Sequence, residues 1–426
     1  MSIQLFNRFQ QNKAYKQLAV NAFAMLIIQV SNYLIPIITF PYLLRTLGIE
    51  GFGIMSFTQN IFSYFEQFLN YGFVYAAPRD IAQNSEDKTH ISQTFYSIFY
   101  TKIVLLAVCL VILIPLFAFV PRLTGLHAVA LSGLSILVAN VLQIDWFFQG
   151  IQQMKNITYA NVLARMVSLI LLFSFVKSPN NVAEALLAIS ISQILANIFL
   201  WLLAYQRHGI TFVPPQYVLI KKQLEGGFAI FSSQFLVRFY SADVNLTLLG
   251  FFTNNVTVGT YAIANKIFSL VALVISPINA ALYPYLAKLF STDYGAFWRQ
   301  FYRFVQLYAL LYVSLAVGLF LSADFIITLI NGAPNVLAAT LLRFLSLAIA
   351  VAPFGSLLVQ ALLLHKKDRI LFYINLMLVA LNLVSVVPLF LYFQEIGLAI
   401  NTILMHWVIV GSLFFIVYRL KNVSTT

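Results

Sequence analysis

Long runs of apolar residues recur along the whole length of this 426-residue chain. A helix rises 1.5 Å per residue, so roughly 20 apolar residues cross the hydrocarbon core of a bilayer, which is about 30 Å thick. The composition agrees, because 61% of the residues are hydrophobic and only 9% are charged, whereas soluble domains carry about a quarter charged residues. We therefore expect an all-α integral membrane protein, and the composition excludes a water-soluble enzyme.

Twelve apolar ranges are long enough to span a bilayer and are predicted to be transmembrane helices. They are residues 17–43, 52–76, 91–118, 126–149, 157–177, 183–205, 224–251, 257–286, 299–321, 336–364, 370–393 and 396–418. Residues 323–330 leave two alternatives open, a short extracytoplasmic helix or an extension of the ninth range.

The positions of Lys and Arg test this count. With the N-terminus in the cytoplasm, 17 of the 25 basic residues fall in cytoplasmic segments and five lie within the predicted helices. Only Arg45, Arg122 and Lys177 fall on the opposite side. An excess of basic residues on the cytoplasmic side is the usual bias of membrane proteins. A missed or invented helix would break this bias partway along the chain, so we expect twelve spans with both termini in the cytoplasm.

The two halves of the chain match each other at a constant offset of 206 residues. The matching positions are Gly53 and Gly259, Pro78 and Pro284, residues 61–63 and 267–269, and residues 95–96 and 301–302. This repeat predicts an N-terminal six-helix lobe (1–206), a basic cytoplasmic connector (207–223) and a C-terminal six-helix lobe (224–426). Two such lobes usually enclose a central cavity and rock against each other.

Eight charged residues are expected inside the apolar ranges. Each costs at least about 2.5–3.5 kcal/mol at a helix centre unless it faces protein or water. They are Lys102, Arg165, Arg238, Lys266, Arg343, Glu66, Asp145 and Asp243. Arg238 and Asp243 are five residues apart, roughly 140° around a helix, so they are not expected to pair with each other.

Cations outnumber anions among these eight residues, and Arg45 and Arg79 lie near the ends of predicted helices. This balance favours a cationic lumen for an anionic substrate, because a phosphate or diphosphate needs new partners when it leaves water. The predicted substrate-binding residues are Arg238, Lys266, Arg45, Arg343, Arg165, Lys102 and Arg79. The predicted ion-coupling or gating residues are Glu66, Asp243 and Asp145. Structural pairing between helices is the competing interpretation of all these charges.

No catalytic constellation is recognisable in the sequence. A nucleotide-binding loop of the Gly-x-x-x-x-Gly-Lys-Ser/Thr type is absent, and the five histidines lack metal-ligand spacing. We therefore expect no enzyme activity, no cofactor and no metal. The basic loops lack the aromatic residues typical of nucleic-acid binding and are better explained by orientation and by contact with anionic lipid headgroups.

Four stretches resemble the Wzx-type O-antigen flippases, the polysaccharide-exporter branch of the multidrug/oligosaccharidyl-lipid/polysaccharide (MOP) superfamily. They are residues 41–53, residues 70–82, residues 145–150 with Met154, and residues 258–261 with Ala264 and Lys266. The resemblance implies that an undecaprenyl-diphosphate-linked oligosaccharide is moved from the cytoplasmic to the periplasmic leaflet of a bacterial inner membrane, in lipopolysaccharide biosynthesis. It also implies alternating access, ion coupling, and a polysaccharide polymerase and a chain-length regulator as partners.

In that family a cationic lumen is described, and the matching positions here are Arg45, Arg79, Asp145, Arg238, Asp243 and Lys266. One position departs from the family pattern, because Tyr285 stands where a basic residue is expected.

Three alternative functions remain open. A multidrug cation exporter of the same superfamily would need an acidic, aromatic cavity. A lipid II-type flippase generally has two further spans. A non-transporting scaffold for polysaccharide enzymes would tolerate loss of the intramembrane cations.

Overall fold

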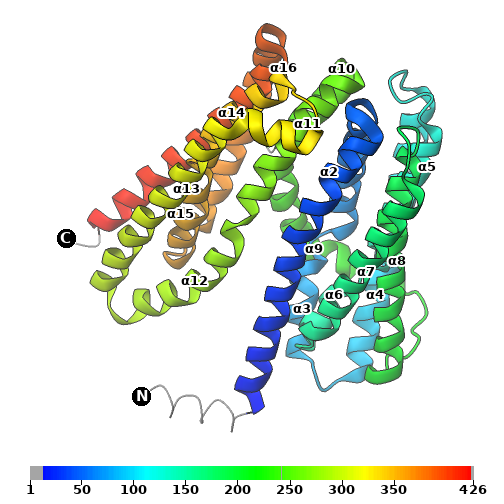
Figure 1. Cartoon of the computed structure of the whole chain (residues 1–426). Helices are drawn as coiled ribbons and strands as arrows, with labels where there is room; N and C mark the ends of the chain where they lie inside the picture. The colour runs from blue at the N-terminus through cyan, green and yellow to red at the C-terminus, as the bar shows by residue number, and fades with distance from the viewer. Residues whose placement is uncertain (1–12, 241, 424–426) are drawn as a thin grey trace. The chain divides into compact units, whose positions relative to one another are not determined.

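The computed structural model describes residues 13–240 and 242–423, and every secondary-structure element in these two ranges is a helix (Figure 1). In chain order the helices are α2 (Lys13–Asn70), α3 (Phe73–Gln83), α4 (Lys88–Phe119), α5 (His127–Leu142), α6 (Asp145–Gly150), α7 (Met154–Phe175), α8 (Val182–His208), α9 (Tyr217–Arg238), α10 (Ala242–Phe252), α11 (Asn255–Leu273), α12 (Ile275–Thr292), α13 (Tyr294–Asn331), α14 (Val336–Ile349), α15 (Ala352–Leu364) and α16 (Asp368–Val423). The predicted all-α class is therefore confirmed. The two chain ends, whose cytoplasmic placement is predicted, lie outside the described residues.

Within the described residues, eight helices are long and apolar enough to cross a membrane, or nine if α9 and α10 are counted as one bent span. Large apolar side chains are exposed along them, for example Val111 on α4 and Leu310 and Leu321 on α13. Such surfaces fit a lipid environment and not water. The chain is a multi-pass membrane protein.

Residues 323–330 extend the ninth predicted range, because α13 runs without interruption to Asn331.

Several predicted ranges are joined or divided in the structure. The first two lie on α2, which is interrupted at Gly48, where φ is 70°, a conformation that glycine adopts without steric cost. The last two lie on α16, which is interrupted at Gln394. The seventh range, 224–251, is divided between α9 and α10, which form a bent pair.

Short polar side chains fix where several helices begin. Asp87 accepts hydrogen bonds from two backbone N–H groups at the start of α4. Asn254, Asp293 and Asn335 each accept one at the starts of α11, α13 and α14. Such N-caps satisfy N–H groups that have no intrahelical partner and stabilise a helix by about 1 kcal/mol each. The boundaries of these helices therefore follow from local sequence.

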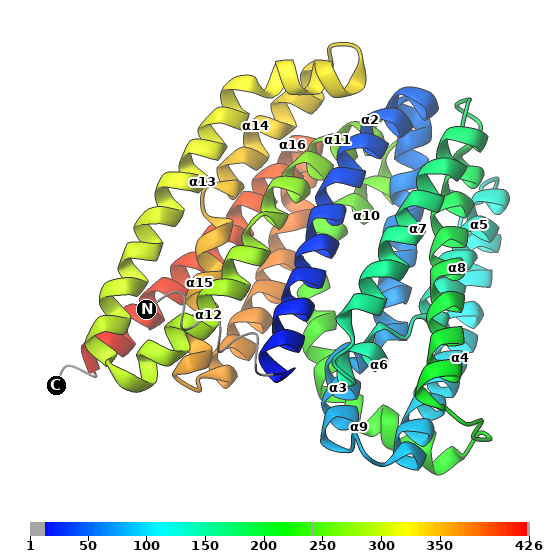
Figure 2. The same ribbon diagram turned by 60° about the horizontal axis from the view of Figure 1, so that its bottom comes forward.

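The chain divides into two compact units. Unit 1 comprises Met1–Gly48 and Thr58–Phe235, and unit 2 comprises Ile49–Phe57 and Leu236–Thr426. In unit 1, α5 and α7 pack along α8, α4 packs on α5, and the short helix α3 packs on α6 (Figure 2). In unit 2, α14 packs against α11, α13 and α16.

Two glycines related by the sequence repeat pack in one reciprocal contact within unit 2. A Cβ atom on Gly53 would meet the carbonyl oxygen of Asn255, and a Cβ atom on Gly259 would meet that of Ile49. Both pairs of positions, 49 with 255 and 53 with 259, are 206 residues apart. Helix backbones that approach this closely leave no room for a side chain. The repeat therefore corresponds to a physical contact between equivalent helix segments.

Candidate functional site

Lys102 lies in α4 and is only 2% exposed. Its Nζ donates hydrogen bonds to the backbone oxygens of Asn140, at 2.7 Å, and Gln143, at 3.4 Å. These oxygens lie where α5 ends, and the last carbonyl groups of a helix have no intrahelical partner. The ammonium group therefore caps α5 and complements the negative end of its dipole.

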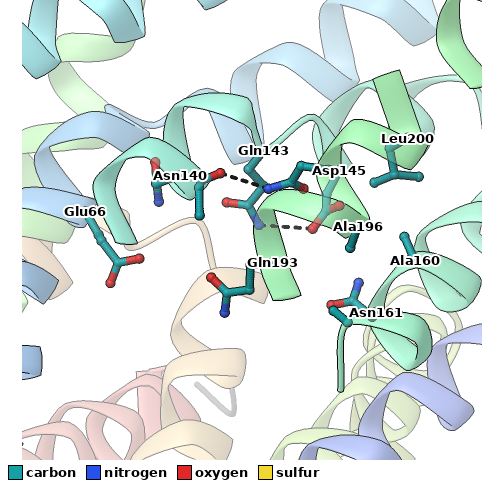
Figure 3. A pocket seen from close by; sticks show the side chains of 12 residues that line it. Glu66, Asn140, Gln143, Asp145, Ala160, Asn161, Gln193, Ala196 and Leu200 are labelled. Atoms are coloured by element: carbon teal, nitrogen blue, oxygen red, sulfur yellow. Dashed lines mark hydrogen bonds between the residues drawn. The ribbon is translucent and has the colours of Figure 1, made fainter. Parts of the chain in front are cut away.

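Two side chains of α8 cap the same end of α5. Asn197 Nδ2 and Trp201 Nε1 each donate to a carbonyl oxygen of α5 at 2.8 Å. The chain then turns, and α6 begins at Asp145, whose Oδ2 accepts a hydrogen bond from Gln143 Nε2 at 3.0 Å (Figure 3). Side chains from α4, α6 and α8 thus gather around one helix end, deep among apolar helices.

A polar cavity of about 160 Å³ opens beside this helix end in unit 1, between α2, α5, α6, α7 and α8 (Figure 3). Its lining residues are Glu66, Ala139, Asn140, Gln143, Asp145, Ala160, Asn161, Ala164, Gln193, Ala196, Asn197 and Leu200. The alanines leave the space open, and two carboxyl and five carboxamide groups make it polar. We call it the unit 1 cavity.

The unit 1 cavity brings together three residues that the sequence singled out. Glu66 and Asp145 line it, and Lys102, behind the wall, interacts electrostatically with both carboxylates. One of the lining residues also has a buried acceptor without a partner. Asn140 is 7% exposed, and its Oδ1 has no hydrogen-bond partner among the described residues. A buried polar atom of this kind normally finds a partner in protein, water or a bound ion.

Arg165 lines a neighbouring cavity of about 200 Å³ in unit 1. Three residues, Asn161, Ala164 and Gln193, line both cavities, so the two spaces share a wall formed by α7 and α8. Arg165 and Asn161 are four residues apart and lie on the same face of α7. The face of α7 turned into unit 1 is therefore polar over at least one helical turn.

Arg238 and Asp243 form an ion pair at 2.5 Å, so the prediction that they do not pair is wrong. The predicted angle assumed one continuous helix, but α9 ends at Arg238 and α10 begins at Ala242. Asn382 Nδ2 donates to the carbonyl oxygen of Phe239 at 2.7 Å. Arg238 at the C-terminal end of α9 and Asp243 in the first turn of α10 also have the signs that stabilise those helix ends.

Arg343 in α14 also has an acidic partner within unit 2. Its guanidinium group forms an ion pair with Asp324 of α13, a residue that the sequence did not single out. The pair lies between two helices that pack together. Asp324 lies three positions beyond the end of the predicted ninth range, so the only sequence signal for it was a lone carboxylate in an otherwise apolar segment.

The remaining predicted cations are exposed. Arg45 lies on α2, Arg79 on α3 and Lys266 on α11. No hydrogen bond or ion pair to a described residue is found for Lys266 or Arg79. The seven predicted substrate-binding residues therefore differ in kind. Lys102, Arg238 and Arg343 have partners within their own units, whereas Arg79 and Lys266 are exposed without such a partner among the described residues.

The amide groups of the unit 1 cavity were missed by the sequence reasoning. They are Asn140, Gln143, Asn161, Gln193 and Asn197. A signal was present, since Gln193 and Asn197 are four residues apart in an apolar helix and so share one face. Charged side chains give a stronger sequence signal than amide side chains, because burying a charge in a bilayer costs more free energy.

Apolar helices that hold charged and amide groups inside them are typical of a multi-pass membrane protein, and solved structures of membrane proteins share the fold. The chain aligns with an inward-facing multidrug resistance MATE family transporter of the MOP superfamily with a TM-score of 0.71, at 14% identity over 96% of this chain and 99% of that one. It aligns with the lipid II flippase MurJ with a TM-score of 0.70, at 12% identity over 94% of this chain and 87% of that one.

The chain belongs to the polysaccharide biosynthesis protein family, which matches residues 18–290. A candidate O-antigen transporter of Escherichia coli (strain K12) is 28% identical over 400 residues, covering 94% of this chain and 96% of that protein. A candidate O-antigen transporter of Shigella dysenteriae is 25% identical over 391 residues, covering 92% and 97%. The resemblance indicated by the four sequence stretches is therefore confirmed.

Proposed function

We propose that this protein flips an undecaprenyl-diphosphate-linked oligosaccharide from the cytoplasmic to the periplasmic leaflet of a bacterial inner membrane. The observation that carries the proposal is the match to the two O-antigen transporters, which extends over more than nine-tenths of the chain. The structure contributes physical support, because charged and amide groups lie inside apolar helices where they are costly without a function.

The proposed architecture has twelve spans with both termini in the cytoplasm, arranged as two six-helix lobes around a central cavity. Transport follows alternating access and is ion-coupled. A lipid-linked sugar needs polar surroundings for the glycan and cations for the diphosphate, since an unpaired phosphate in hydrocarbon is prohibitively costly. A polysaccharide polymerase and a chain-length regulator are the proposed protein partners.

The diphosphate is assigned first to Arg238, Lys266 and Arg45, with Arg343, Arg165, Lys102 and Arg79 as further candidates. Lys266 and Arg45 are both exposed. Arg238 is held by Asp243, and its side chain is 27% exposed, so a phosphate group could compete with that carboxylate for the guanidinium. Lys102 is the weakest candidate, because backbone oxygens already engage its ammonium group.

A leaflet-resolved flipping assay in proteoliposomes tests the proposal directly, with a defined undecaprenyl-diphosphate oligosaccharide as substrate. We expect flipping with the wild type and at least a tenfold slower rate with Arg238→Ala. Arg299→Ala is the matched control, because Arg299 is an exposed arginine at the start of α13 and pairs only loosely with Asp293, at 3.8 Å. Equal rates for all three proteins would remove Arg238 from the mechanism, and no flipping by the wild type would refute the proposed function.

A multidrug cation exporter is the second candidate, because the unit 1 cavity is acidic and the fold is shared with a multidrug transporter. Cells with and without the gene should differ in resistance to cationic drugs if this alternative holds. Lipid II as a second substrate in the flipping assay separates the lipid II-type alternative from the proposed function.

A further inference from the structure

Another polar cavity of unit 1, of about 240 Å³, lies between α3, α4 and α9 (Figure 2). Each helix lines it with residues at positions i, i+3, i+4 and i+7, counted from Phe73 on α3, His90 on α4 and Leu219 on α9, and Gly227 adds one more from α9. Residues at this spacing lie on one face of a helix. Three helices therefore turn one face each to a common space, which we call the α3–α9 cavity.

One end of the α3–α9 cavity is closed by a tight contact between α9 and the residues just before α3. A Cβ atom on Gly227 would lie 2.6 Å from the carbonyl oxygen of Tyr71. Beside this contact, Gln223 Nε2 donates a hydrogen bond to Ser97 Oγ at 3.0 Å. Gly227 and Ser97 are buried, whereas Lys222 is exposed. The cavity is therefore a pocket that opens on the side of Lys222.

The lining residues include a carboxylate that is already held and a cation that is not. Asp80 Oδ2 accepts hydrogen bonds from His90 Nε2 at 3.0 Å and from Thr94 Oγ1 at 2.9 Å, since an ionised carboxylate can only accept. Lys222 makes no hydrogen bond or ion pair with another described residue. Its neighbour Lys221 differs, because it has an acidic partner one turn further along α9. The ammonium group of Lys222 is therefore available to a ligand.

The other available groups of the cavity include donors and acceptors. The Gln93 side chain makes no hydrogen bond with another described residue, and Asp80 Oδ1 accepts none. A lysine ammonium group binds phosphate as a point charge, whereas amide and carboxylate groups together suit hydroxyl groups, which both donate and accept. The volume of about 240 Å³ is below the roughly 300–1,000 Å³ of pockets for drug-sized ligands. The ligand is therefore a small molecule or the headgroup of a larger one.

We propose that the α3–α9 cavity binds a phosphorylated polyol, with its phosphate group at Lys222 and its hydroxyl groups between Gln93 and Asp80. Two sources offer this chemistry, the glycerophosphate headgroup of an anionic lipid and a soluble sugar or glycerol phosphate. The α3–α4 loop and the start of α9 belong to segments predicted to be cytoplasmic, so the ligand enters from that side. Once bound, it joins α9 to α3 and α4 beside the hydrogen bond between Gln223 and Ser97. Binding here involves none of the residues assigned to the diphosphate.

Thermal unfolding of the purified full-length protein in phosphatidylcholine nanodiscs tests the site with two probes. The soluble probe is glycerol 3-phosphate, and the lipid probe is phosphatidylglycerol at increasing mole fraction in the nanodisc. We expect a saturable rise in melting temperature with at least one of them. A response to glycerol 3-phosphate identifies a soluble ligand, and a response to phosphatidylglycerol alone identifies a lipid headgroup. Inorganic phosphate and phosphatidylserine are the references for negative charge without the glycerol group, and each should act more weakly than its matching probe.

Two variants place the ligand in the cavity. Lys222→Gln removes the cation, and Gly226→Leu fills the space, since a Cβ atom on Gly226 meets nothing within 4 Å. Each should raise the half-saturating ligand concentration at least about tenfold, as expected for a lost charge-assisted hydrogen bond. Lys221→Gln is the matched control, because Lys221 is an exposed lysine one residue away that does not line the cavity.

Three results would overturn this site. The first is that neither probe raises the melting temperature, and the second is that inorganic phosphate or phosphatidylserine acts as strongly as its matching probe. The third is a response that survives in both cavity variants or disappears in Lys221→Gln as well. The melting temperature of each variant without ligand shows whether it is folded. Because the measurement needs no transport, a protein that binds the probe but flips nothing would refute only the proposed function.

Discussion

At the scale of single residues, the ammonium group of Lys102 is a buried charge that joins α4 to the end of α5. Lys102→Met keeps much of the side-chain volume but removes the charge that engages the carbonyl groups at the end of α5 and the carboxylates of Asp145 and Glu66. Removing one partner from a buried charge arrangement typically costs about 3–5 kcal/mol. We expect the melting temperature of the purified protein to fall markedly, with a loss of about 3 kcal/mol in the free energy of unfolding.

A double-mutant cycle separates the charge effect from a packing effect. Asp145→Asn removes one negative charge, so combining it with Lys102→Met restores the balance and should recover part of the stability. Two substitutions that act independently add within about 0.5 kcal/mol. Strict additivity would show that Lys102 matters only through its volume.

The sequence predicts which charged residues are buried but not which residues they pair with. Buried charges could be predicted individually, because their cost inside a bilayer is large and local. Their partners could not, because pairing depends on where helices end. Arg238 and Asp243 illustrate this. On one continuous helix they would point in different directions, but the break between α9 and α10 lets them form an ion pair. Arg343 and Asp324 come from different helices, so no spacing rule links them.

At the scale of helices, the crossing of α2 and α11 depends on Gly53 and Gly259. A Cβ atom on either residue would meet backbone atoms of the other helix segment, and backbone cannot move aside as a flexible side chain can. Overpacking of this kind costs about 1–3 kcal/mol. Gly53→Ala and Gly259→Ala should therefore each lower the melting temperature of the purified protein.

A third glycine provides the control for this prediction. Gly318 lies inside α13, also in unit 2, and a Cβ atom there would meet nothing within 4 Å. Alanine has the higher helix propensity, by roughly 0.8–1 kcal/mol, so Gly318→Ala should leave the melting temperature unchanged or raise it. A similar loss of stability in all three variants would mean that the close approach of α2 and α11 is not what the glycines provide.

Helix existence and the breaks within α2 and α16 could be predicted from the sequence, whereas the break between α9 and α10 could not. An apolar run long enough to cross a bilayer must be helical, because its backbone groups have no other partners in lipid. The interruptions of α2 at Gly48 and of α16 at Gln394 lie in the polar gaps between predicted ranges, residues 44–51 and 394–395. The break between α9 and α10 is held by a side chain from α16, Asn382, which lies far away in sequence.

At the scale of the whole molecule, helix length bears on the number of membrane crossings. A helix of 56 residues, the length of α16, is about 84 Å long at 1.5 Å per residue. That is almost three times the thickness of the hydrocarbon core, about 30 Å. The interruption at Gln394 allows α16 to turn back and cross twice, and the same argument applies to α2 at Gly48. These helix lengths favour twelve crossings over eight or nine.

Cysteine accessibility tests the number of crossings, because Cys109 is the chain's one cysteine and is buried. In a Cys109→Ala background, a membrane-impermeant thiol reagent applied to intact cells with a permeable outer membrane should label Asn180→Cys and Pro334→Cys, which lie in exposed loops. Pro215→Cys and Lys367→Cys should react only after the inner membrane is disrupted. The basis is the excess of Lys and Arg in the segments predicted to be cytoplasmic.

The last helix provides the decisive pair of positions. If α16 crosses the membrane twice, Glu395→Cys next to the interruption reacts from outside, whereas Lys421→Cys reacts only after disruption of the inner membrane. If α16 crosses once, Lys421→Cys reacts in intact cells, because Lys367 and Lys421 then lie on opposite sides. External labelling of Lys421→Cys would overturn the twelve-span topology, and with it the equivalence of two six-helix lobes on which the proposed alternating access depends.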